Sequence, residues 1–254
     1  MFTDLTASLP SNMSISALEV EEAGFVAYVG DSEGSIQVVD TRAAAAKLPQ
    51  GLNLNKRINT LSLEPGSQQL LAAACSSGSV AVWDVRRLNQ AGQGMGAGGS
   101  SGRRGEPLCL VQHPNSCQSA YWAPDGSKRL LSTSFDNTLR VWAPAAPAPP
   151  APPLAAATPD SPALSLTQAQ VLPHDNQTGR WLVPFRAVWG PAADCVAVGS
   201  MSRGVDLFTP DCAYKVGSLA EGELMKSIVS RLAFHPHCHA LAAANGSGRL
   251  HVWR

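Results

Sequence analysis

The segment from His174 to Trp189, HDNQTGRWLVPFRAVW, places a cation beside a large aromatic ring where a turn between two strands is expected. Gly179 permits a tight backbone, Arg180 offers a planar guanidinium to a phosphate or a base edge, and Trp181 can stack on a base. Stacking is worth ~1–3 kcal/mol per base and would offset part of the cost of unstacking a base step. The alternative is that Trp181 packs between strands as core. We expect it to be exposed, because its neighbours already supply apolar side chains.

A second motif, Trp83-Asp84-Val85-Arg86, has the composition of a strand end followed by a turn. Trp83 and Asp84 are expected to close the strand and hold the turn. Arg86 would then stand on the face opposite Arg180, where it is available to a protein partner.

Catalytic and metal-binding patterns are weak. The chain has no nucleophile elbow, no H-E-x-x-H and no P-loop, and its acids are scattered singly through predicted turns. His235 to His239 supplies three histidines and one cysteine from a single short turn, whereas a zinc site needs ligands that converge from two places. Residues 94–99 match G-x-G-x-x-G inside a low-complexity stretch with no helix after it. We therefore predict no enzyme, no cofactor and no metal.

The elements that must position these residues are strands in five copies of one pattern. Each copy has a strand that ends near a Pro or Gly turn, an apolar strand of small residues, a polar turn and an alternating strand that ends in an aromatic residue or Val. The last strands end near Val39, Trp83, Trp142, Phe208 and Trp253, at intervals of 44, 59, 66 and 45 residues. Once the insertions in the two long intervals are removed, the period is about 42, which is typical of a four-stranded propeller blade.

Two segments interrupt the repeats. Residues 89–105 are rich in Gly and Ser, residues 143–162 are rich in Pro and Ala, and neither composition can form a core. Each follows the third strand of a blade, so both are expected on the same face. The whole chain, residues 1–254, is predicted to be one all-β propeller domain of about five blades, with Phe2 to Thr6 as a candidate outer strand. An incomplete ring whose earlier blades are missing fits the same count.

Composition and charge limit the function classes. Lys and Arg together number 19, as do Asp and Glu, and 44% of the 254 residues are hydrophobic. Balanced charge does not indicate a nucleic-acid or membrane partner, so any such surface must be local. No signal-like N-terminus or long apolar run appears, and the six scattered cysteines are typical of reduced thiols. We expect no membrane association and a nuclear location, with the cytoplasm as the alternative.

One propeller face concentrates cations. The loops that enter the first strands and the turns between second and third strands emerge together. They carry Lys56, Arg57, His113, Asn115, the segment from His174 to Arg186, Arg203, Lys226 and Arg231, against the acids Glu33, Asp136 and Asp175. A locally cationic face suits phosphate contacts whose strength falls with salt, while the alternative is that these side chains are merely solvated.

The repeats together with NQTGRWLVPFRAVWGPAADCVAVGSM, WDVRRLN and the closing GSGRLHVW resemble the DNA-damage-binding WD-repeat family. That family contains the changed-mutation-rate protein and its animal counterpart and is related to the small subunit of the UV-damaged-DNA-binding complex. The resemblance implies a seven-bladed propeller, of which this chain would be a C-terminal portion with five blades. It implies that Gly179, Arg180 and Trp181 correspond to a wedge that enters the minor groove. The tripeptide itself differs from the wedge of that subunit.

The resemblance also implies partners. It predicts contacts with double-stranded DNA in the damage response, chromatin proteins as further partners, and docking of the WDxR box to the propeller adaptor of a cullin-RING ubiquitin ligase. Ser77 stands where that box usually has a preceding Asp. The predicted DNA-binding residues are Lys56, Arg57, Gln177, Gly179, Arg180, Trp181 and Arg186, and the predicted partner-binding residues are Trp83, Asp84 and Arg86. A protein-interaction scaffold or ligase receptor without direct DNA binding remains the alternative function.

Overall fold

The structure is a computed structural model of the chain that describes residues 14–42, 52–86, 106–145, 164–179 and 182–254. These residues form eighteen strands. The first seven are β1 (Ile15–Val20), β2 (Val26–Asp31), β3 (Ile36–Asp40), β4 (Ile58–Leu63), β5 (Leu70–Cys75), β6 (Ser79–Asp84) and β7 (Cys109–Gln112). The next four are β8 (Cys117–Trp122), β9 (Leu130–Ser134), β10 (Thr138–Pro144) and β11 (Leu166–Pro173). The last seven are β12 (Val188–Trp189), β13 (Val196–Ser200), β14 (Gly204–Phe208), β15 (Lys215–Leu219), β16 (Val229–Phe234), β17 (Leu241–Asn245) and β18 (Leu250–Trp253).

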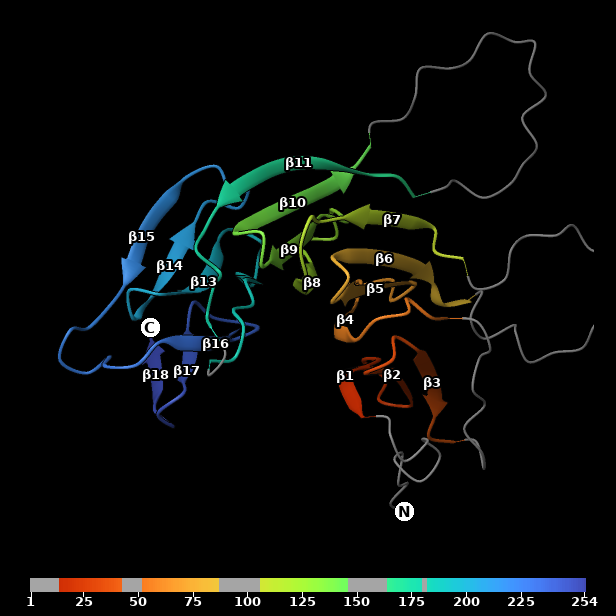
Figure 1. The fold of residues 1–254 in the computed structure, drawn as a ribbon, viewed down its shortest axis with the longest axis horizontal. Coiled ribbons are helices and arrows are strands. Elements are labelled where there is room, and N and C mark those ends of the chain that lie inside the picture. The colour runs from red at the N-terminus through yellow and green to blue at the C-terminus, as the bar shows by residue number, and fades with distance from the viewer. Residues whose placement is uncertain (1–13, 43–51, 87–105, 146–163, 180–181) are drawn as a thin grey trace, which may run out of the picture.

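The strands make five antiparallel sheets, each built from strands that are consecutive in the chain. The sheets contain β1–β3, β4–β7, β8–β11, β12–β15 and β16–β18. They follow one another around an arc whose two ends are the first and last sheets (Figure 1). Because each sheet is an up-and-down meander that packs on the next, the arrangement is a five-bladed β-propeller, as the repeats predict. The expected outer strand at Phe2 to Thr6 lies outside the described residues.

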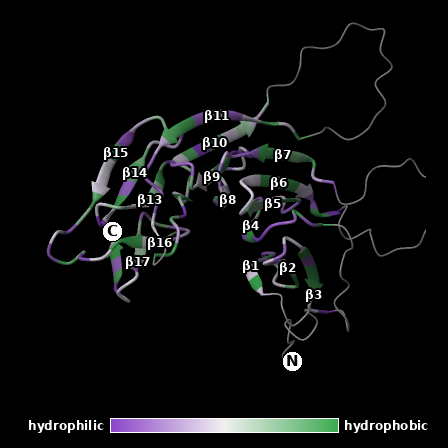
Figure 2. Ribbon diagram, viewed as in Figure 1, coloured by the Kyte–Doolittle hydropathy of each residue, from purple (hydrophilic) through white to green (hydrophobic). Residues whose placement is uncertain are grey.

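The first strand of each blade lies innermost and packs against the first strand of the next, as β1 does on β4 and β4 on β8. Separate apolar clusters fill the spaces between successive blades. β5 (LLAAAC) is buried along its whole length, because its alanines allow neighbouring sheets to approach closely from both sides. Hydrophobic residues dominate β6 and β7, whereas β11 contains both polar and hydrophobic residues along its length (Figure 2).

The aligned anchor residues all fall in third strands, as the repeat predicts: Val39, Trp83, Trp142, Phe208 and Trp253 lie in β3, β6, β10, β14 and β18. The Gly/Ser-rich and Pro/Ala-rich segments fall between β6 and β7 and between β10 and β11, largely outside the described residues. Ala143 and Pro144, assigned to the second segment from composition, are the last residues of β10. They pair with Thr167 and Leu166, so the strand continues past the composition change.

A buried hydrogen-bond network spans the third blade. His113 Nδ1 lies 3.1 Å from Asp136 Oδ2, and His113 Nε2 lies 2.8 Å from Ser132 Oγ. Trp142 Nε1 donates to the same Ser132 Oγ at 2.8 Å, and Arg140 Nη2 reaches Asp136 Oδ2 at 2.7 Å. Since a carboxylate only accepts, His113 carries its proton on Nδ1 and accepts from the serine at Nε2. We call these five residues the His113 network; it ties the connection into β8 to β9 and β10.

Candidate nucleic-acid interface

Lys56 and Arg57 lie directly before β4, on the face where chains enter the inner strands, and both are exposed. Their backbone is held on two sides. Cys75 Sγ donates to the carbonyl of Lys56 at 3.1 Å, and the N–H of Ser76 donates to the carbonyl of Arg57 at 2.9 Å. Gly34, with φ of +95°, passes so close that a Cβ there would lie 2.6 Å from the Lys56 backbone. The two cations therefore project from a fixed part of this face.

The connection between β11 and β12 is anchored by alternate residues. The side chains of His174, Asn176 and Thr178 are largely buried, whereas Asp175, Gln177 and Gly179 are exposed. Asn176 Nδ2 donates to the carbonyls of Ser134 at 2.9 Å and Thr138 at 3.2 Å, and its own N–H donates to Asn137 Oδ1 at 3.1 Å. Because buried and exposed residues alternate, one side of the segment packs on the third blade and the other side faces solvent.

Aromatic packing fixes both ends of this connection. His174 makes edge contacts with Phe185 and Phe208, at ring separations of 6.1 and 6.0 Å, and Phe185 is fully buried. Gly179 has φ of +69°, a left-handed backbone conformation that favours glycine, and nothing lies within 4 Å of its Cβ position. Arg180 and Trp181, at the centre of the prediction, lie outside the described residues. The structure describes the segment that precedes them, up to Gly179, and the segment that follows them, from Leu182.

Two other predicted DNA-binding residues differ in their surroundings. Gln177 is exposed, and its amide nitrogen Nε2 donates to the carbonyl of Phe135 at 2.6 Å, so this side chain fixes the loop to the third blade. Arg186 is only half-exposed. It lines a pocket beside the inner strands β1, β4 and β8, which we call the inner channel, and its Nη2 donates there to the carbonyl of Asn59 at 2.9 Å. Arg186 is thus separated from the tip of the loop and grouped with the inner strands.

The expectation that His113 belongs to the cationic face is wrong. Its ring is fully buried in the His113 network, and burial lowers its pKa more than Asp136 raises it, which favours the neutral ring. Asp136, expected among the acids of the face, is likewise enclosed, with 8% of its side chain exposed. The local sequence around His113 and Asp136 does not indicate this burial, because the hydrogen-bond partners of each residue lie elsewhere in the chain.

The cationic face is also less uniform than the sequence indicated. Arg203 and Lys226 are exposed as expected, but the connection between β15 and β16 adds two exposed acids, Glu221 and Glu223. Positive charge is therefore concentrated at Lys56, Arg57 and the mouth of the inner channel rather than spread over every loop.

On the opposite face, the two ends of the WDxR box differ. Trp83 is 2% exposed and packs in the core between the first and second blades. Asp84 holds Arg86 by two parallel bonds, Nε to Oδ1 at 2.9 Å and Nη2 to Oδ2 at 2.6 Å, and 62% of the Arg86 side chain remains exposed. Of the three predicted partner-binding residues, only Arg86 offers substantial surface.

The first blade repeats this arrangement. Asp40 holds Arg42 by Nε to Oδ1 at 2.9 Å and Nη2 to Oδ2 at 2.8 Å, and the guanidinium also lies 5.0 Å from the centre of the Phe25 ring. The contact with Arg42 lowers the pKa of Asp40 to about 2. Sequence reasoning missed this second box, although VVDTR aligned with VWDVR carries the signal.

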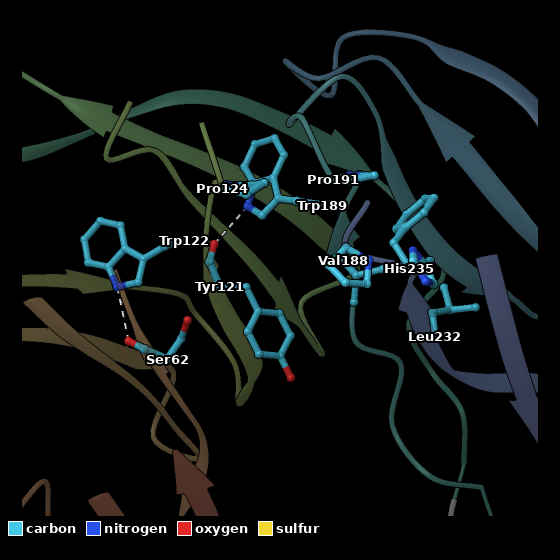
Figure 3. A pocket seen from close by; sticks show the side chains of 12 residues that line it. Ser62, Tyr121, Trp122, Pro124, Val188, Trp189, Pro191, Leu232 and His235 are labelled. Atoms are coloured by element: carbon cyan, nitrogen blue, oxygen red, sulfur yellow. Dashed lines mark hydrogen bonds between the residues drawn. The ribbon is translucent and has the colours of Figure 1, made fainter. Parts of the chain in front are cut away.

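A pocket lies at the far end of the inner strands, beyond Trp122, Trp189 and Phe234, which end β8, β12 and β16 (Figure 3). Trp122 Nε1 donates to the carbonyl of Ser62 at 3.2 Å, and Trp189 Nε1 donates to that of Tyr121 at 2.9 Å. Both indole N–H groups are thereby satisfied within the protein, so these rings offer the pocket apolar surface.

In the described ranges, no three His, Cys, Asp or Glu side chains come together in a way that could hold a metal ion. Nor do those ranges contain a helix of the length and hydropathy that crossing a membrane requires.

The chain resembles known proteins in both sequence and fold. The WD domain, G-beta repeat model matches residues 105–143, which include the whole His113 network. WD repeat-containing protein 76 of Xenopus laevis is 32% identical over 231 residues, covering 90% of this chain and 35% of that protein, and its Mus musculus counterpart is 33% identical over 232 residues. DNA damage-binding protein CMR1 of Phaeosphaeria nodorum is 26% identical over 248 residues, covering 94% of this chain and 44% of that protein.

The chain thus spans about a third of the length of these WD repeat-containing protein 76 relatives and under half of this CMR1 protein. Among solved structures, a chain of a mitotic checkpoint complex matches with a TM-score of 0.64 and 16% identity, covering 96% of this chain and 64% of that one. This structural likeness supports the propeller fold alone.

Proposed function

We propose that this chain, a WD-repeat β-propeller homologous to the WD repeat-containing protein 76 and CMR1 proteins, binds duplex DNA in the nucleus as part of the response to DNA damage. The CMR1 relatives carry DNA damage binding in their names. The contacting face would be the one that presents Lys56, Arg57 and the β11–β12 connection.

The observation that carries this proposal is the anchoring of the β11–β12 connection. Three inward residues hold the chain before Gly179, and the fully buried Phe185 holds it after Val183. An arginine and a tryptophan that stand in the sequence between two such ordered flanks would lose less conformational freedom on binding than in a freely moving loop. Cations that project nearby at Lys56 and Arg57 supply phosphate contacts on the same face.

The test is duplex DNA binding followed by fluorescence anisotropy across a salt series. The double variant Arg180→Ala/Trp181→Ala is expected to bind about 5- to 150-fold more weakly, since loss of one stacked base costs ~1–3 kcal/mol. Arg86→Ala is the matched control, because it removes one positive charge from the opposite face. Equal affinity of the double variant and the parent at every salt concentration would contradict the proposal.

A second candidate function is receptor docking to a ligase adaptor, supported by the paired boxes at Asp40–Arg42 and Asp84–Arg86. Both arginines are preset by bidentate bonds on neighbouring blades and are largely exposed. Co-purification of the adaptor is expected to fall in Arg86→Ala and further in Arg42→Ala/Arg86→Ala. If the double variant still co-purifies with the adaptor, this candidate function is ruled out.

A further inference from the structure

Two arginines lie near each other beside the inner strands, since Arg231 bonds to the carbonyl of Pro184, two residues before Arg186, and the charge of Arg186 contributes to the lowered pKa of Arg231. Arg186 lies two residues before β12, and Arg231 is the third residue of β16, which packs on β12. Arg231 Nη1 donates to the carbonyl of Pro184 at 2.6 Å and to that of Ser230 at 3.0 Å. Arg186 Nη2 donates across the channel to the carbonyl of Asn59 at 2.9 Å. Backbone carbonyls of β4, of β16 and of the β11–β12 connection therefore set the direction of the two guanidinium groups.

Neither guanidinium forms an ion pair with a carboxylate in the part of the chain that the structure describes. Every ion pair formed among the described residues involves other cations, and Arg42, Arg86, Arg129 and Arg140 each have a carboxylate. Partial burial and the charge of Arg186 lower the pKa of Arg231 to about 10. At neutral pH two like charges thus lie near each other, partly removed from water, and no carboxylate in residues 14–42, 52–86, 106–145, 164–179 or 182–254 pairs with either of them.

Hydrogen-bond donors also remain unused. A guanidinium carries five N–H groups on three nitrogens, and here only one nitrogen of each arginine finds an acceptor among the described residues. Tyr121 lines the same pocket as Arg186, and in Figure 3 its phenol ring extends away from the two indole rings. The site offers planar donors from two sides and a hydroxyl, which is the donor set that a tetrahedral oxyanion accepts.

One carboxylate, Glu19, lines this pocket too. Its Oε1 accepts from the N–H of Leu63 at 2.9 Å, whereas Arg186 bonds to Asn59, at the other end of β4. Four residues along a strand separate the two points by roughly 13 Å. Glu19 therefore does not neutralise the arginine pair.

We propose that Arg186 and Arg231 bind one phosphate group at the channel mouth, and that in the DNA complex this group is a backbone phosphate. Asn59, which holds Arg186, is only two residues after Arg57, so the pair opens on the face that carries the proposed DNA contacts. The DNA assignment rests on the proposed function, whereas the phosphate site does not.

The first experiment uses the chain without DNA. Thermal unfolding in inorganic phosphate is compared with sodium chloride at equal ionic strength. At about ten times Kd, a bound phosphate is expected to raise the Tm by about 3–6 °C. The rise should disappear in Arg231→Gln and Arg186→Gln and persist in Arg249→Gln. Arg249 is a matched control, an exposed arginine that also donates to one carbonyl, that of Leu224 at 3.2 Å.

Arg231→Lys keeps the charge without the planar fork and guards against a variant that fails to fold. A reduced but measurable phosphate response in this variant is expected. If Arg231→Gln, folded by circular dichroism, keeps the full response, there is no phosphate site at this pair.

The second experiment separates the two sources of phosphate. In the DNA salt series, Arg186→Gln/Arg231→Gln is expected to reduce the slope of log affinity against log salt by about 1, as for one lost phosphate contact. Phosphate stabilisation with no DNA binding by the parent chain would contradict the proposed function and identify free phosphate as the ligand. An unchanged slope in the double variant would overturn the DNA assignment.

Discussion

Two connections lead into the inner strands of adjacent blades and differ in whether their polar side chains are buried within the protein or exposed to solvent. The short connection from β7 to β8 turns His113 inward, where every polar group of the His113 network has a partner within the protein. The longer connection from β11 to β12 also buries a histidine, His174, but it presents exposed residues at Asp175, Gln177 and Gly179 and ends with Arg186, which bonds to the inner strand β4. The comparison indicates that the buried histidine anchors each connection, and that only the length beyond the anchor is available for binding.

The largest expected effect comes from removing the closed network. His113→Ala removes one hydrogen-bond partner each from Ser132 and Asp136 and opens a cavity, so the free energy of unfolding should fall by about 2–4 kcal/mol. Urea unfolding measures this loss, with Asn115→Ala, on an exposed neighbour, as the control. DNA affinity per folded molecule should not change. A large DNA effect with little loss of stability would show that the two connections do not divide their roles in this way.

His174→Ala should affect both properties. Its Nδ1 lies 2.8 Å from Asn176 Oδ1 and its ring contacts Phe185, so the loss of both contacts should cost about 1–3 kcal/mol and loosen the loop that leads to Gly179. DNA affinity should therefore fall together with stability, in contrast to His113→Ala. Anisotropy at a temperature where the variant is fully folded distinguishes the two effects. Parent-like DNA affinity in folded His174→Ala would mean that this anchor does not order the binding loop.

Acid should weaken both anchors. Burial is the main cause that lowers the pKa of His113 and of His174 below the usual value near 6.5. A base whose pKa is lower in the folded state contributes stability above pH 6.5, and that stability is lost as the pH falls toward the folded value. Urea midpoints should therefore decrease between pH 7 and pH 5, with a smaller decrease in His113→Gln/His174→Gln. The lowered carboxyl pKa values of Asp136 and Asp206 act only in more acidic solution.

The smallest effect on stability is expected at the opposite face. Arg86 forms a bidentate pair with Asp84, yet most of its side chain is in water, where such pairs add little. Arg86→Ala should leave the Tm unchanged within error. A clear drop in Tm would mean that this arginine supports the fold, and its use as a neutral control for DNA binding would be lost.

Sequence periodicity predicted much of the fold, since the five copies and their anchor residues correspond to the five blades. The burial of a strand can be predicted from its own sequence, either from alternating polar and apolar residues or from a run of small apolar ones, which is why the fold prediction succeeded. The surroundings of the site residues could be predicted less well. Lys56, Arg57 and Gly179 are exposed as expected, but His113 is buried and Trp83 is core. Burial of a single polar or aromatic residue depends on partners that lie far away in the chain.

What the sequence by itself determined is the set of blades, their order, and the unusual arginine and tryptophan placed beyond an anchored histidine. These follow from local patterns, because strand alternation and turn residues act over a few positions. Only the tertiary structure decided that Arg186 lies near Arg231 and reaches Asn59, 127 residues away, while His113 bonds to Asp136 and Ser132. Electrostatic pairing depends on distances in space, and chain folding brings these groups together irrespective of their separation in sequence.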